Sequence, residues 1–168
     1  MDTPPSMWRA ELWHPLVVHF PIALLVVGTT LRLLGMGHRR HKMLRVAQLA
    51  GRLLLIMGTV GAWAAIYTGS IADAAVARAL CDPTVVEQHE RWAYVIAWLF
   101  TAIVVVDGFT TYVRPLPHLG RLSLRAFLIV SLLVGCGGLG YVGHLGATLV
   151  YQQGAAVYDP APDCAAFE

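Results

Sequence analysis

Four long stretches of the chain are apolar and nearly free of charge, and they set the expected architecture. A helix that crosses a lipid bilayer needs about 20 predominantly apolar residues, and each stretch reaches that length. The connections between them are short, so neighbouring helices are expected to run antiparallel. The pattern therefore predicts an all-α, transmembrane four-helix antiparallel bundle with spans at about residues 15–35, 50–72, 91–113 and 125–151.

The composition points to the same class. Of 168 residues, 57% are hydrophobic and 13% are charged, whereas soluble domains contain about 25% charged residues. The length suits one integral membrane domain over residues 1–168, with residues 152–168 as a tail after the last span. Residues 1–13 do not resemble a cleaved signal peptide, because they lack a basic leader before a short apolar core. We therefore expect the first span to be retained.

Basic residues gather beside two of the three connections, and this predicts the orientation. Lysine and arginine near span ends favour the cytoplasmic side, which assigns the loops around Arg39 and Arg121 to the cytoplasm. Nine of the ten acidic residues lie on the opposite side, the exception being Asp107. Both termini are then expected on the outer, periplasmic side of a bacterial inner membrane. The basic run at 39–42 also resembles a nucleic-acid patch, but beside four spans we interpret it as a topology signal and expect no nucleic acid.

Four histidines map near the outer face of the predicted bundle. His14 lies at the entrance of span one, and His89 begins span three at nearly the same level. His19 is five residues deeper than His14, about 7–8 Å along a helix, and shares its depth with His144 of span four. Five helical residues rotate a side chain by about 140°, so His14 and His19 are not expected to ligate one metal. Imidazoles in a membrane need partners, and several at similar depth suit a haem iron or another transition metal.

Span four also has glycines at every third position, namely Gly137, Gly140, Gly143 and Gly146. Glycine in a helix interior lowers the stability of the helix by about 1 kcal/mol relative to alanine, so a run of glycines requires a structural or functional explanation. Close approach of another helix is one reason. Close approach of a flat cofactor is the other, and His144 lies between Gly143 and Gly146.

Two segments resemble the opening and closing signatures of a bacterial membrane-protein family, domain of unknown function 2231. They are His-Pro-Leu-Val-Val-His-Phe-Pro-Ile-Ala-Leu at 14–24 and Gly-His-Leu-Gly-Ala-Thr-Leu-Val-Tyr at 143–151. The resemblance implies a four-span inner-membrane protein with histidines in spans one, three and four, and suspected respiratory or haem-linked roles. Ala147 and Gln153 stand where relatives often have Gly and His, so one outer site is expected to be absent here.

The first functional hypothesis is a b-type haem that transfers electrons. His19 and His144 would be the axial ligands, and a bis-histidine iron without an open position suits electron transfer. His14, Arg91 and Arg78 would hold the propionates, with Gly143 and Gly146 against the haem face. The protein would then be at most an electron-transfer component of an oxidoreductase. Its expected partners are lipid, respiratory-complex subunits, a cytochrome and quinol.

Three other hypotheses remain open. His14, His89 and Glu90 would form a copper or zinc site, although no spacing such as HExxH supports it. Alternatively, the histidines only bond between helices, in a structural or accessory subunit. A small-solute or ion transporter would depend on Asp107 as a relay. For Asp107 we favour an ion pair with Arg52 or Arg125, at the same level of the membrane.

The cysteines predict one cross-link. Cys81 is expected in the outer loop and Cys164 in the outer tail, where the compartment is oxidising. A Cys81–Cys164 disulfide would pin the tail across the histidine end. Cys136 is expected to be a packing residue in span four.

Overall fold

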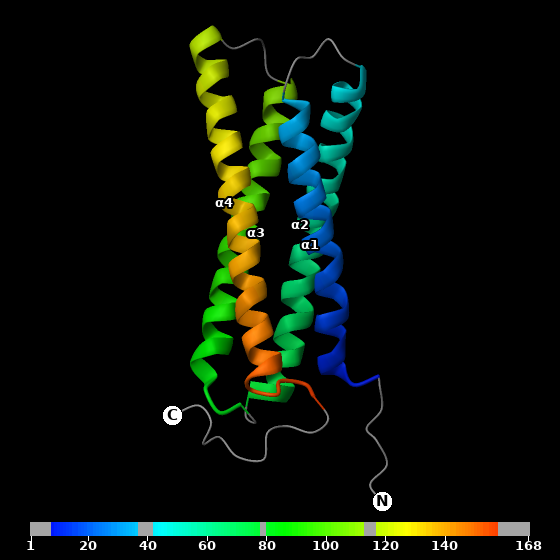
Figure 1. Ribbon diagram of the computed structural model, residues 1–168, viewed down its shortest axis with the longest axis vertical. Helices are drawn as coiled ribbons and strands as arrows, with labels where there is room; N and C mark the ends of the chain where they lie inside the picture. Colours follow the sequence, from blue (N-terminus) through cyan, green and yellow to red (C-terminus); the bar gives the residue numbers. More distant parts are fainter. Residues whose placement is uncertain (1–7, 37–41, 78–79, 113–116, 158–168) are drawn as a thin grey trace, which may run out of the picture.

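The computed structural model describes residues 8–36, 42–77, 80–112 and 117–157, although not the side chains of 110–112 and 118. Within these residues the protein is all-α (Figure 1). Each of the four long helices is long and apolar enough to cross a membrane. In chain order the elements are the 3-10 turn η1 (Ala10–Leu12), α1 (Trp13–Gly35), α2 (Lys42–Val76), α3 (Pro83–Tyr112) and α4 (His118–Tyr151).

All four helices begin before the spans that the apolar pattern predicts, and three of them begin much earlier. α2 begins at Lys42, α3 at Pro83 and α4 at His118, each about two turns early. The limits of the predicted spans were set at charged residues. A helix, however, forms its backbone hydrogen bonds whether its side chains are apolar or polar, so it can continue beyond the apolar stretch. His89 therefore lies inside α3, on its second turn, and does not begin it.

The bundle consists of two helical hairpins, α1 with α2 and α3 with α4, and packing is closest within each hairpin (Figure 1). In the first hairpin the helices run in opposite directions. Gly35, at the end of α1, lies against Gln48 near the start of α2. His14, near the start of α1, bonds to Ala65 in the second half of α2.

A short repeat explains why α1 and α2 approach so closely. The sequence Leu-x-x-Gly-Thr occurs once in each helix, and the glycine of each copy lies against the leucine of the other. A Cβ on Gly28 would lie 3.0 Å from the backbone nitrogen of Leu55, and a Cβ on Gly58 would lie 2.8 Å from the side chain of Leu25. The contact is reciprocal, so the two helices pack around a local two-fold relation.

The outer surface of the bundle is apolar. Large hydrophobic side chains are exposed along all four helices, from Leu16 and Phe20 to Val134 and Tyr151. A surface of this kind suits a lipid solvent, where apolar side chains face outward without cost. The largest fully buried side chains are Leu25, Leu55, Phe100, Ile103 and Leu132.

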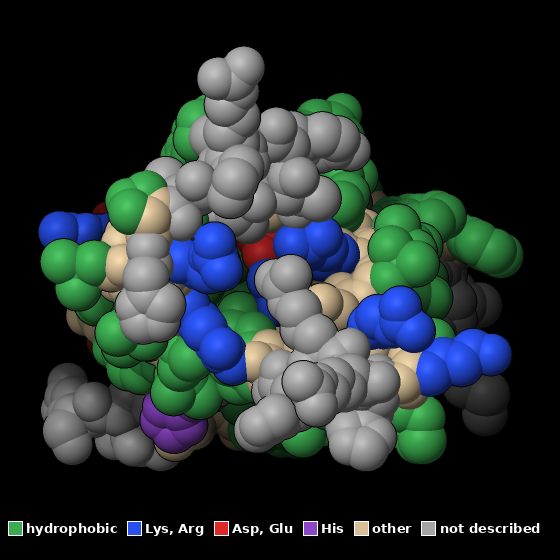
Figure 2. Space-filling model, turned by 90° about the horizontal axis from the view of Figure 1, so that it is seen from above, with side chains coloured by type: hydrophobic (Ala, Val, Ile, Leu, Met, Phe, Trp, Pro, Cys, Tyr) green, Lys and Arg blue, Asp and Glu red, His purple; other side chains and the backbone are tan. Residues whose placement is uncertain are grey.

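The two ends of the bundle differ in charge. Lysine and arginine side chains cover the end at which α2 and α4 begin, around an acidic side chain (Figure 2). We call this the basic end; its described basic residues include Lys42, Arg45, Arg52, Arg121 and Arg125. We call the opposite end the histidine end; it has the acidic residues Glu11, Asp73, Asp82, Glu87 and Glu90.

Candidate metal site and buried charge cluster

His14 and His89 meet inside the histidine end. Their ring centres are 6.1 Å apart and the ring planes are nearly perpendicular, at 84°. The two residues come from α1 and α3, one from each hairpin, and both are half-buried. With a metal–nitrogen bond of about 2 Å, two imidazoles on one ion have ring centres roughly 5 to 6.5 Å apart. The observed spacing is within this range.

Backbone carbonyls of the other two helices orient both rings. The Nδ1 atom of His14 lies 2.9 Å from the carbonyl oxygen of Ala65 in α2. The Nδ1 atom of His89 lies 3.1 Å from the carbonyl oxygen of Val142 in α4. A carbonyl only accepts, so each Nδ1 donates its proton, and the lone pair of each neutral ring is on Nε2. Metal-bound histidines are commonly fixed by an outer hydrogen bond of this kind.

Two glycines provide the space for these rings. A Cβ on Gly69 of α2 would lie 3.1 Å from Cε1 of His14, and a Cβ on Gly146 of α4 would lie 3.2 Å from Cε1 of His89. Gly146 was expected to lie against a haem, and it contacts an imidazole. All four helices thus contribute to the histidine pair, two with side chains and two with carbonyls and glycines.

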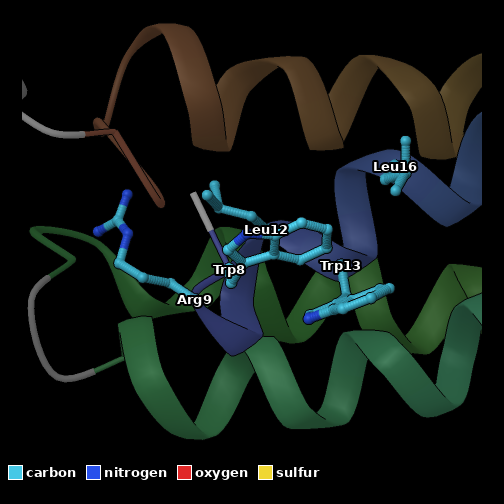
Figure 3. Close-up of a pocket in the computed structure, with 5 residues that line it drawn as sticks. All are labelled: Trp8, Arg9, Leu12, Trp13 and Leu16. Atoms are coloured by element: carbon cyan, nitrogen blue, oxygen red, sulfur yellow. The ribbon is translucent and has the colours of Figure 1, made fainter. Parts of the chain in front are cut away.

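The histidine pair is separate from the surface pocket at the same end. That pocket is lined by side chains of η1 and its neighbours (Figure 3), namely Trp8, Arg9, Leu12, Trp13 and Leu16. The described residues of its lining include no imidazole, thiol or carboxylate. The Nη2 atom of Arg9 donates to the carbonyl oxygen of Ala156 at 3.4 Å, which joins the start of the bundle to the turn after α4.

His19 and His144, the expected haem ligands, lie on the outside of the bundle. Both side chains are exposed, on α1 and α4 respectively. His19 Nδ1 bonds to the carbonyl oxygen of Pro15, one turn earlier in the same helix. Among the described residues, no hydrogen bond or ring contact joins His19 to His144. Arg91 is also exposed, and Arg78 lies outside the described residues.

The remaining donor groups do not complete a larger metal cluster. Among the residues that the structure describes, no three His, Cys, Asp or Glu side chains lie close enough to hold one ion. Glu90, expected as a third ligand, is exposed. A metal at the histidine pair therefore has two protein ligands from the described part of the chain.

The predicted disulfide has one cysteine inside the described residues. Cys81 is bonded and is not a free thiol, whereas Cys164 lies outside the described residues, so the Cys81–Cys164 pairing stays a prediction. Cys136 is free and half-buried in α4.

Asp107 forms a buried charge cluster near the basic end. Arg32 of α1 binds both carboxylate oxygens, with Nε 3.0 Å from Oδ2 and Nη2 on Oδ1. Arg52 of α2, the expected partner, donates from Nε to Oδ2 at 2.9 Å. Arg125, the other expected partner, is exposed on α4.

Arg32 is the residue that sequence reasoning missed. Its signal is its position four residues after Gly28 and three before Gly35, because both glycines face α2 at close range. A residue with this helical spacing from two interface glycines points into the hairpin. The carbonyls of Ala65 and Val142 left no signal, since any residue type supplies them.

The fold and its apolar surface define the class as a four-helix membrane protein. The chain belongs to the DUF2231 family, described as predicted membrane proteins, whose model matches residues 12–159. No curated protein matches the chain, and no solved structure does.

Proposed function

We propose that the protein binds a transition-metal ion between His14 and His89. One observation supports this most strongly: two imidazoles from different hairpins approach each other while both of their Nδ1 atoms are occupied by backbone carbonyls. The Nε2 lone pairs are the free ligand atoms of this pair, and imidazole suits copper, zinc and iron.

Copper is the metal that this donor set favours. Both ligands are neutral, and the described residues add no carboxylate or thiolate to the pair. Because the cost of burying a charge rises with its square, a singly charged ion suits such a site better than a doubly charged one. Monovalent copper meets this condition. Its redox chemistry would suit electron transfer or copper handling at the outer face of the inner membrane.

The test is copper binding by purified protein in nanodiscs, measured against a competing Cu(I) chelator. We expect one ion per chain, and affinity reduced more than about tenfold in His14→Ala and in His89→Ala. His19→Ala and His144→Ala are the controls, since each removes an exposed histidine, from α1 and α4 respectively, outside the proposed pair. Copper binding that survives both His14→Ala and His89→Ala would exclude this site and leave the pair as a structural contact.

A b-type haem on the outer surface is the second candidate. His19 and His144 are exposed on neighbouring helices, and Cβ atoms on Gly137, Gly140 and Gly143 would meet nothing within 4 Å. An open glycine face beside a histidine admits a flat cofactor, which would carry electrons from a quinol to a cytochrome or another respiratory subunit. The same four variants test it: a reduced-minus-oxidised band near 560 nm, roughly as bis-histidine haem b shows, must disappear in His19→Ala and His144→Ala.

The orientation belongs to the same proposal. The basic end faces the cytoplasm of a bacterial inner membrane, because lysine and arginine concentrate there. The histidine pair then faces the outer compartment.

A further inference from the structure

The buried charge cluster near the basic end contains more positive than negative charge. Arg32 and Asp107 are 5% and 4% exposed, and Arg52 supplies a second guanidinium. Within the described part of the chain, the cluster thus combines two positive charges with one carboxylate. An uncompensated charge in a membrane-embedded interior is unfavourable, so an additional negative charge would stabilise this set of residues.

The hydrogen bonds of the cluster are incomplete as well. Arg32 uses Nε and Nη2 on Asp107, while its Nη1 is buried without a hydrogen-bond partner. Thr29 lies one turn earlier on α1, is 2% exposed, and its Oγ1 also has no partner. Buried donors without acceptors are rare because they lose their hydrogen bonds to water and gain none in the protein.

We propose that the cluster binds an anionic phosphate oxygen through Arg32 Nη1, with Thr29 Oγ1 as a second donor. A phosphate oxygen supplies both missing elements, the negative charge and the acceptor. Guanidinium groups favour oxyanions because their planar donors match the oxygen geometry. The excess of arginine over carboxylate selects an anion and disfavours a cation.

The cluster reaches the surface of the basic end through Arg52. Arg52 is partly exposed, with 29% of its side chain accessible, and the basic end surrounds it with further lysine and arginine (Figure 2). Charges of one sign concentrate anions near an opening. Arg32 is three residues from Gly35, about 4.5 Å along the helix, so the cluster is close to the level of lipid headgroups.

Two sources supply this chemistry, an anionic phospholipid and dissolved inorganic phosphate. The first arm of the test measures phosphatidylglycerol retained by the full chain, by native mass spectrometry of protein taken from mixed phosphatidylglycerol–phosphatidylcholine nanodiscs. The second arm measures binding of inorganic phosphate by equilibrium dialysis in a neutral detergent. Saturable one-to-one binding in either arm identifies the source.

Three variants separate the cluster from general surface charge. Arg32→Gln removes the unpaired donor and leaves Asp107 paired with Arg52, so we expect binding weakened by about tenfold or more. Asp107→Asn removes the competing carboxylate, so we expect tighter binding. Arg45→Gln, which removes an exposed arginine from the same end, is the matched control and should change binding by less than about twofold.

The proposal fails if neither ligand binds, if Arg32→Gln binds like the parent, or if Arg45→Gln weakens binding equally. Where Arg32→Gln does not fold by circular dichroism, Arg32→Lys replaces it, because lysine retains the charge and lacks Nη1. The proposal does not rest on copper binding, which we propose at the opposite end. Copper titration of Arg32→Gln should match the parent, so failure of one proposal is distinguishable from failure of the other.

Discussion

Asp82 begins α3 by capping it. Its Oδ1 accepts hydrogen bonds from the backbone nitrogen of Thr84 at 2.9 Å and from the Thr84 hydroxyl at 2.7 Å. Pro83 occupies the first helical position, where its missing N–H costs nothing. These two hydrogen bonds lower the pKa of Asp82 below its ordinary value of 3.8. The carboxylate form is therefore the capping form.

The lowered pKa predicts how the start of α3 responds to acid. The stabilisation is complete above the ordinary pKa and is lost as the pH falls through the lower pKa of the folded state. The protection factors of the amides at residues 84–88, which compare the measured exchange rate with the intrinsic rate at the same pH, should fall at low pH in the parent. Asp82→Asn retains a capping oxygen but does not titrate, so its protection factors should not show this fall. An equal fall in both proteins would contradict the assignment.

The histidines show what the sequence predicted at this scale and what it did not. The shared level of His14 and His89 followed from span boundaries, and the 140° separation of His14 from His19 followed from helix geometry. Which of the two points inward was not predictable from either. That choice depends on the contact between Gly69 and the His14 ring, a packing relation between helices that are distant in sequence.

At the scale of elements, the α1–α2 hairpin depends on backbone-to-backbone contact. A Cβ on Gly51 would lie 2.6 Å from the backbone nitrogen of Arg32. Backbone cannot move aside as a side-chain tip can, so the helices themselves must separate. The hairpin therefore tolerates no methyl group at this position without rearrangement.

Gly51→Ala should destabilise the protein by about 1–3 kcal/mol, the usual range for overpacking. Gly137→Ala is the control, because a Cβ there meets nothing within 4 Å. It should be neutral or stabilising by up to about 1 kcal/mol, since alanine is the better helix former. Unfolding of both variants in detergent, followed by circular dichroism, checks the difference; equal stability would contradict the close packing.

The four helices were predictable from the length of their apolar stretches, but how closely each pair of helices packs was not. The glycines of span four were the conspicuous run in the sequence. Close contact of glycine with the backbone of another helix instead occurs at Gly28, Gly35, Gly51 and Gly58 in the first hairpin, where the two such glycines of each helix are seven residues apart. In span four, Gly135 and Gly138 lie against side chains of α3. A seven-residue spacing is less conspicuous in a sequence than a three-residue repeat. It indicates a helix–helix contact only when the two helices are aligned in opposite directions, so that their glycines face each other.

At the scale of the whole molecule, the charge difference between the ends predicts a fixed topology. Met43 is exposed at the basic end and Glu87 is exposed at the histidine end. In intact cells, a membrane-impermeant maleimide should label Glu87→Cys and not Met43→Cys. Inverted vesicles should give the opposite result, and the parent chain measures background labelling. Labelling of Met43→Cys from outside would reverse the orientation.

The hydrogen bonds of the two imidazoles have a mechanical consequence. His14 is tied to Ala65 within the first hairpin, and His89 is tied to Val142 within the second. Each ring therefore moves with its own hairpin, and the gap between the rings follows the seam between the two halves of the bundle. The proposed ion would therefore link the two hairpins, and sliding of one hairpin against the other would lengthen its bonds to the two imidazoles.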